Sequence, residues 1–84
     1  MTTLSIQVPD SLFAVLHKSP IELTQEVQLL AAAKWYEQGQ LSQEKAAEFA
    51  GLSREVFMLE LSRLGVSPFQ YTAESLAREL DDAD

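Results

Sequence analysis

Cysteine is absent from the sequence, and histidine occurs once, as His17. Without cysteine the chain can form neither a disulfide nor a thiolate metal site, and a lone histidine has no second such ligand with which to share a metal ion. We therefore predict no metal site and no cofactor. We interpret His17 as a helix-end or surface residue rather than as a catalytic base.

Basic residues are scarce, and long apolar runs are missing. Six Lys and Arg stand against thirteen Asp and Glu, so the formal net charge is -7. Such a charge repels nucleic acid at long range and favours a basic partner surface. No apolar run approaches the ~20 residues that a membrane helix needs, and the N-terminus lacks the pattern of a signal peptide. We expect a cytoplasmic protein without membrane association.

The residue groups that common enzymes use are missing as well. The sequence has no glycine-rich phosphate loop and no recognisable His-Asp-Ser set. Carboxylates are plentiful, but Glu44, Glu48, Glu55 and Glu60 fall on helix faces that we expect to be solvated. We therefore predict that the protein is not an enzyme.

Residues 41–57 carry the most informative pattern, which is a helix, a short turn and a second helix. Ser42 can cap the first helix, and Gly51 can end it in the left-handed conformation. Ser53 can cap the second helix. Small side chains at Ala46, Ala47 and Ala50 allow another helix to approach closely. The segment predicts a helix-turn-helix, a motif typical of regulators and interaction modules.

The outward face of the second helix leaves two uses open. With Phe57, Leu61 and Leu64 directed to the core, that face consists of Glu55, Val56, Leu59, Glu60, Ser62 and Arg63, of which one is basic. Glu60 also stands where the motif expects an apolar residue. The candidate DNA contacts are Ser53, Arg54, Ser62 and Arg63. Val56 and Leu59 suit a protein contact instead, with the motif serving only as a scaffold.

The N-terminal residues have the period of a β-strand. Leu4, Ile6 and Val8 alternate with polar residues, and Pro9 ends the run. Because no second strand is evident in the sequence, this strand needs another partner. We predict a two-stranded ribbon with a second copy of the chain, in which Leu4, Ile6 and Val8 are the dimer contacts. The alternative is an unpaired extended arm.

Two helices are predicted between this strand and the helix-turn-helix. Asp10 or Ser11 is expected to cap a short first helix. Ser19, Pro20 and Glu22 form a capping-box pattern that predicts a long helix over residues 20–38. Its apolar residues lie on two sides, with Leu23, Val27, Leu30 and Ala31 on one and Ile21, Leu29, Ala32, Ala33, Trp35 and Tyr36 on the other. We expect a central helix buried on both sides, with Trp35 and Tyr36 as core anchors.

The C-terminal part of the sequence predicts an extended segment followed by a short helix over residues 73–80. Its candidate partner-binding residues are Phe69, Tyr71, Leu76, Arg78 and Leu80. The predicted fold class is mainly α: a small helix-turn-helix domain with a short N-terminal β-strand and a C-terminal helical appendage. Residues 1–65 form the domain, and residues 66–84 form the appendage.

Four stretches of the sequence carry a family resemblance, namely residues 32–39, 41–47, 51–54 and 65–68. They resemble an uncharacterised family of small prokaryotic helix-turn-helix proteins, which are regarded as predicted antitoxins and are frequently paired with PIN-domain toxins, a class of metal-dependent ribonucleases. The similarity runs from Leu4 to Leu80. It implies a dimeric member of a toxin–antitoxin system that silences a toxin and regulates transcription of its own operon.

Our leading hypothesis from the sequence is therefore an antitoxin-like regulator. It binds a cognate toxin through the C-terminal residues and operator DNA through the helix-turn-helix. Arg78 is included among the toxin contacts because a cation that enters a carboxylate-rich nuclease site could displace its metal. The alternative is a protein–protein interaction module that does not bind DNA.

Overall fold

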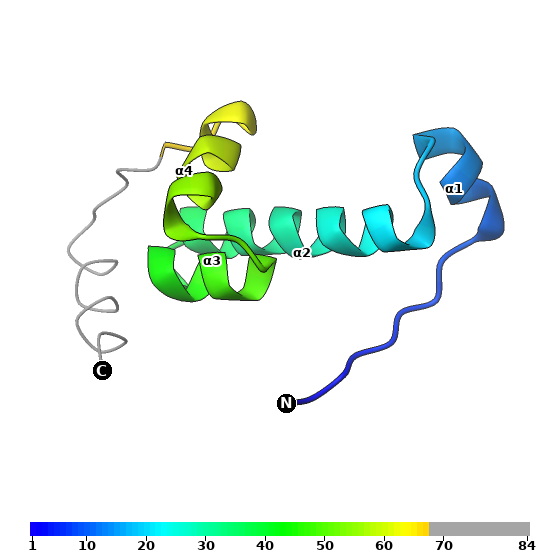
Figure 1. The fold of residues 1–84 in the computed structure, drawn as a ribbon, viewed down its shortest axis with the longest axis horizontal. Coiled ribbons are helices and arrows are strands. Elements are labelled where there is room, and N and C mark those ends of the chain that lie inside the picture. Colours follow the sequence, from blue (N-terminus) through cyan, green and yellow to red (C-terminus); the bar gives the residue numbers. More distant parts are fainter. Residues whose placement is uncertain (68–84) are drawn as a thin grey trace.

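The computed structural model describes residues 1–67, which contain four helices (Figure 1). They are α1 (Asp10–Leu16), α2 (Pro20–Glu37), α3 (Gln43–Ala50) and α4 (Arg54–Arg63). Helix α2 forms the long axis, with α3 and α4 beside its C-terminal half and α1 at its other end. The main helix-to-helix contacts of the described part join α2 to α3 and α3 to α4. The prediction of a mainly α protein is confirmed, whereas the helix predicted over residues 73–80 lies outside the described residues.

Residues 1–9 do not form the predicted β-strand. They run back beneath α2 in extended conformation, as Figure 1 shows, and no strand is assigned anywhere in residues 1–67. The side chains of Leu4 and Ile6 are 84% and 71% exposed, and Val8 is half-buried. A strand needs the backbone of a neighbouring strand, and the described part of one chain supplies none. Within a single chain, the extended arm is the correct alternative.

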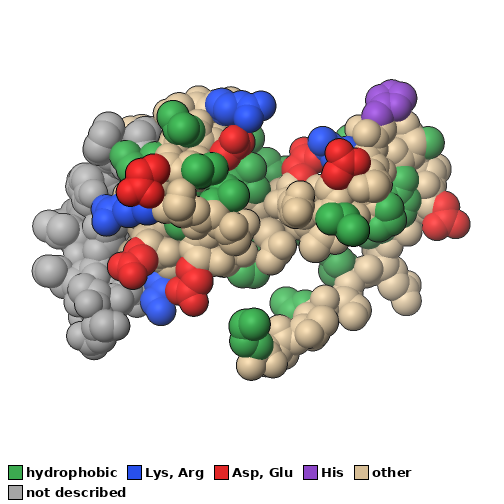
Figure 2. Space-filling model, in the orientation of Figure 1, with side chains coloured by type: hydrophobic (Ala, Val, Ile, Leu, Met, Phe, Trp, Pro, Cys, Tyr) green, Lys and Arg blue, Asp and Glu red, His purple; other side chains and the backbone are tan. Residues whose placement is uncertain are grey.

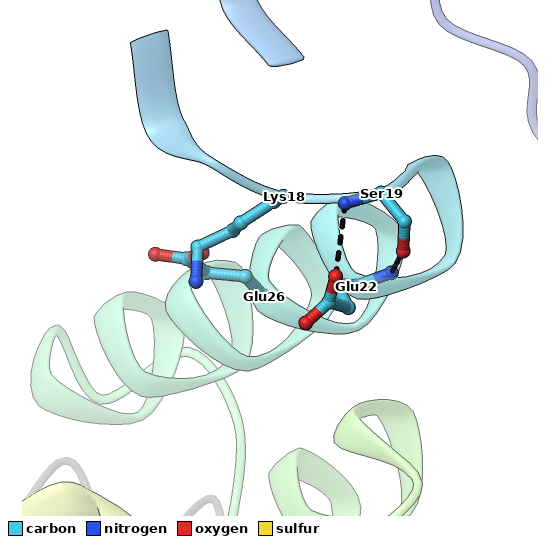
Figure 3. Close-up of polar contacts among 4 residues, drawn as sticks. All are labelled: Lys18, Ser19, Glu22 and Glu26. Atoms are coloured by element: carbon cyan, nitrogen blue, oxygen red, sulfur yellow. Dashed lines mark hydrogen bonds and ion pairs between the residues drawn. The ribbon is translucent and has the colours of Figure 1, made fainter. Parts of the chain in front are cut away.

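Helix α2 begins with the predicted capping box (Figure 3). The backbone N–H of Glu22 donates to Ser19 Oγ at 3.2 Å, and the backbone N–H of Ser19 donates to Glu22 Oε1 at 3.0 Å. The hydrogen bond from the Ser19 backbone is the main reason that the pKa of the Glu22 carboxyl lies below its ordinary value. One turn further on, Lys18 Nζ pairs with Glu26 Oε2 at 3.0 Å. The entry to α2 is therefore fixed by local contacts.

The N-terminus of helix α1 is capped differently from the prediction. Its N-cap is Pro9, and no side chain caps the helix, so the expected cap by Asp10 or Ser11 is wrong. Proline fits this position because its ring fixes a φ compatible with the start of a helix. His17 is the C-cap, in the left-handed conformation at φ 56°, which confirms its place at the end of the helix.

The core lies at the C-terminal end of α2. Its buried members are Ala32, Ala33, Tyr36, Ala46, Ala47, Phe57, Leu61 and Val66. The four alanines let α2 and α3 approach closely, and the Tyr36 ring meets the Phe57 ring edge-on at 6.3 Å between centroids. Tyr36 is thus a core anchor as predicted. Trp35 is not, because it packs against Phe49 at the surface and stays 39% exposed.

The second side of α2 is only partly covered. Leu23 is buried there, but Val27 and Leu30 are 38% and 45% exposed. Helix α3 packs against the other side of α2 and α4 packs on α3, while α1 lies at the N-terminal end of α2. The prediction that α2 is buried on both sides is therefore wrong for a single chain.

Truncating Leu61 to alanine should lower the free energy of unfolding by about 2 to 5 kcal/mol, because it opens a cavity at a fully buried position. The matched control is Leu59→Ala on the same helix. Leu59 is 66% exposed, and its truncation should change stability by no more than about 0.5 kcal/mol. Urea unfolding followed by circular dichroism measures both values. Equal losses in the two variants would contradict the described orientation of α4.

Candidate macromolecular interface on the helix-turn-helix

The helix-turn-helix forms as its local signals predict. Ser42 Oγ accepts the backbone N–H of Lys45 at 3.1 Å, and Ser53 Oγ accepts that of Val56 at 3.2 Å. Gly51 ends α3 at φ 72°. A Cβ at Gly51 would meet no atom within 4 Å, so glycine is needed there for its backbone conformation rather than for space. These contacts set the direction in which α4 leaves α3.

A buried glutamine, which the sequence analysis did not single out, joins the two helices of the motif. Gln43 is 2% exposed. Its Oε1 accepts a 2.6 Å hydrogen bond from Arg54 Nε, and its Nε2 donates to the Tyr36 hydroxyl at 3.5 Å. The spacing of Gln43 from Ala46 and Ala47, three and four residues on, was the available signal, because it places all three on one helix face. Two successive hydrogen bonds, from Arg54 to Gln43 and from Gln43 to Tyr36, thus connect α4, α3 and α2.

The four candidate DNA contacts are all exposed, but they form two groups. Ser53 and Arg54 lie at the start of α4, and Ser62 and Arg63 lie near its end. Arg63 follows Arg54 by nine positions, or about 13.5 Å along the helix axis. Arg54 is bonded to Gln43, and Arg63 Nη1 pairs with Glu60 Oε1 at 3.0 Å. Each arginine on this face therefore has a partner within the chain.

The apolar part of the same face is also as predicted. Val56 is 42% exposed and Leu59 is 66% exposed. Figure 2 shows hydrophobic side chains at the surface of the helix-turn-helix, with acidic and basic side chains beside them. The outer face of α4 is consequently a mixed surface rather than a basic one.

Leu64 does not belong to the core, contrary to the prediction. It is 40% exposed, and Val66 is buried in its place. After α4 the chain turns at Gly65, whose φ is 76°, and the backbone N–H of Val66 then donates to the Leu61 carbonyl at 2.8 Å. This reversal carries Val66 over the end of the core and leaves Leu64 outside.

A groove with a volume of about 520 Å³ runs between α2 and α4. Its apolar lining includes Leu29, Leu30, Leu52, Val56 and Leu64. The Lys18–Glu26 and Glu60–Arg63 ion pairs also line it. Since each of these charges is paired, the groove presents a mixed polar and apolar surface with little net charge.

Other kinds of site can be judged only for residues 1–67. In that part no three His, Cys, Asp or Glu side chains lie close enough together to hold a metal ion. No helix in that part has the length and apolar character required to cross a membrane. The predicted partner-binding residues Phe69, Tyr71, Leu76, Arg78 and Leu80 lie outside the described residues.

Comparison with known proteins gives one family and two relatives. A family model described as "Uncharacterised protein family (UPF0175)" matches residues 1–84. A UPF0175 protein of Archaeoglobus fulgidus is 42% identical over 59 residues, which cover 70% of this chain and 67% of that protein. A UPF0175 protein of Aeropyrum pernix is 37% identical over 59 residues, covering 70% and 75%. No solved structure matches the chain.

The contact between Gln43 and Arg54 should couple the two residues energetically. In a double-mutant cycle with alanine at both positions, we expect an interaction energy of about 0.5 to 3 kcal/mol in urea unfolding. Lys45 and Glu48 provide the control, because they are exposed and 3.9 Å apart, and such pairs contribute about 0.2 to 1 kcal/mol. Strict additivity at Gln43 and Arg54 would contradict a role for this contact in fixing α4.

Proposed function

The chain belongs to the UPF0175 family, and we propose that it is an antitoxin-like regulator that acts by binding other macromolecules. Its partners are a toxin protein and operator DNA. The observation that carries the proposal is the α3–turn–α4 unit, which is anchored on α2 and leaves the outer face of α4 exposed. A rigid helix presented in this way is the form in which helix-turn-helix proteins meet their partners.

The distribution of charge supports a basic protein as one partner. Five of the thirteen acidic residues and one of the six basic residues follow residue 67. Residues 68–84 therefore hold most of the net charge of -7, together with the apolar candidates Phe69, Tyr71, Leu76 and Leu80. An acidic segment with spaced apolar anchors suits binding to a basic groove. In keeping with the family resemblance, we propose a PIN-domain ribonuclease as that partner.

The second candidate function is a protein interaction module that uses the helix-turn-helix as a scaffold. The specific observation in its favour is that Arg54 and Arg63 are bonded to Gln43 and Glu60. A phosphate would have to share each guanidinium with these intramolecular acceptors. Exposed Val56 and Leu59 offer a protein contact at the same place.

Operator binding separates the two candidates. If α4 contacts DNA, Arg63→Ala should weaken binding to the promoter DNA of its own operon, and the slope of log affinity against log salt should fall by about 1. Lys34→Ala is the control, because Lys34 is an exposed cation on α2 that also pairs with a glutamate. Fluorescence anisotropy at several salt concentrations measures both variants. Absence of specific binding even at low salt would exclude DNA recognition and leave the interaction module.

Toxin binding is tested by removing the C-terminal residues. The truncation should follow Ser67, because Val66 is part of the core. We expect the shortened chain to keep its helical circular dichroism and to lose binding to the PIN-domain protein encoded beside it, measured by calorimetry. The full-length Glu44→Ala variant, altered at an exposed position on α3, is the control and should bind like the unaltered chain. Retained binding by the truncated chain would show that residues 68–84 are not the toxin site.

A further inference from the structure

Arg54 differs from every other Lys and Arg of residues 1–67, because it has no carboxylate partner within that part of the chain. The others each form an ion pair at 3.0 to 3.9 Å, namely Lys18 with Glu26, Lys34 with Glu37, Lys45 with Glu48 and Arg63 with Glu60. Arg54 is exposed and bonds instead to the neutral side chain of Gln43. No carboxylate of the described part therefore balances its positive charge.

The bond to Gln43 leaves the outer end of the Arg54 guanidinium open. Gln43 Oε1 accepts from Arg54 Nε at 2.6 Å. A guanidinium also donates through its two terminal nitrogens, Nη1 and Nη2. No hydrogen bond within residues 1–67 uses either of these two atoms of Arg54. Because Nη1 and Nη2 lie side by side in one plane, they can donate together to a pair of neighbouring acceptors.

The core fixes the direction of this guanidinium. Gln43 is 2% exposed, and its Nε2 donates to the hydroxyl of buried Tyr36 at 3.5 Å. Gln43 is the first residue of α3 and Arg54 the first residue of α4, so their bond joins the starts of the two helices. A side chain that is already held loses less conformational freedom when it binds a ligand. Gln43 thus orients Arg54 before any partner arrives.

The position of Arg54 in the motif indicates which part of operator DNA it meets. In helix-turn-helix proteins the second helix lies in the major groove, and its N-terminal residues contact the edges of the bases. Guanine presents O6 and N7 there as two neighbouring acceptors, and arginine is the residue that most often donates to both. A phosphate offers oxygen atoms in several directions and does not require a fixed pair of donors. The held guanidinium of Arg54 therefore suits a guanine edge better than a phosphate.

Building on the proposed binding of operator DNA, on which this inference rests, we propose that Arg54 recognises a guanine in the major groove and that Gln43 is its positioning residue. Nη1 and Nη2 of Arg54 donate to O6 and N7 of the guanine, while Nε stays bonded to Gln43. Arg63, which is paired with Glu60 near the other end of α4, contacts the phosphate backbone. Arg54 then sets the sequence preference, and Arg63 contributes affinity that does not depend on sequence.

Binding to DNA of varied sequence tests the role of Arg54. The unaltered chain first selects its site from a library of random DNA duplexes, and each G·C pair of the selected duplex is then replaced by A·T. Fluorescence anisotropy should show that one such replacement weakens binding by about 5- to 150-fold. Arg54→Ala should abolish the preference for guanine at that position. Lys45→Ala is the matched control and should keep the preference, because it removes an exposed cation of α3.

Gln43→Met tests positioning separately from stability. Methionine has a similar length but cannot accept the hydrogen bond from Arg54 Nε. We expect this change to reduce the guanine preference when Arg54 is present. It should cause no further loss of affinity in a chain that already carries Arg54→Ala, because no guanidinium is left to orient. Gln43→Glu keeps an acceptor for Nε and should retain the preference, and circular dichroism checks that each variant stays helical.

Three results would contradict the proposal in different ways. If Arg54→Ala weakens binding to all duplexes equally, Arg54 contacts a phosphate, and the guanine assignment is overturned while operator binding stands. If Gln43→Met lowers affinity equally with and without Arg54, its effect is structural, and the positioning role is overturned. If the unaltered chain selects no duplex from the library, operator binding itself is refuted, and the proposal falls with it.

Discussion

Tyr36 is the residue through which three helices are joined. It comes from α2 and is 1% exposed. Its ring meets Phe57 of α4, and its hydroxyl accepts from Gln43 of α3, which in turn accepts from Arg54 at the start of α4. Buried polar groups must be satisfied where they lie, so this chain of contacts restricts how α3 and α4 can sit on α2. The exposed face of α4 is a consequence of that restriction.

The same arrangement concentrates the core at one end of the molecule. Eight buried residues from α2, α3, α4 and Val66 form the core, whereas α1 and the first half of α2 contribute none of them. A core this small gives marginal stability. Val15, Leu16, Val27 and Leu30 lie outside this core, and each stays more than a third exposed.

The sequence predicted those features that depend on near neighbours along the chain. The caps at Ser19, Ser42 and Ser53 and the turn at Gly51 were confirmed, because each depends on contacts within about four residues. The wrong predictions involve contacts that sequence spacing does not determine. Leu64 was predicted to lie in the core, but Val66 is buried there instead, because the chain reverses at Gly65. Trp35 stayed at the surface because its partner on α3, Phe49, is itself exposed. The strand at Leu4–Val8 failed because pairing needs a second backbone.

The sequence predicted which residues of the candidate site are exposed, but not the hydrogen bonds and the ion pair that its arginines make. Ser53, Arg54, Ser62 and Arg63 are exposed as expected, yet Gln43 and Glu60 engage the two arginines. Net charge does not decide what this face binds, because most of the excess acidity lies after residue 67 and exposed charges are screened beyond about 8 Å at physiological salt. Short-range contacts matter instead: a phosphate at Arg63 would share the guanidinium with Glu60, which bonds to Nη1, while a protein surface would cover Val56 and Leu59. The two proposed uses of this face therefore differ in whether the partner bonds to Arg63 or covers Val56 and Leu59.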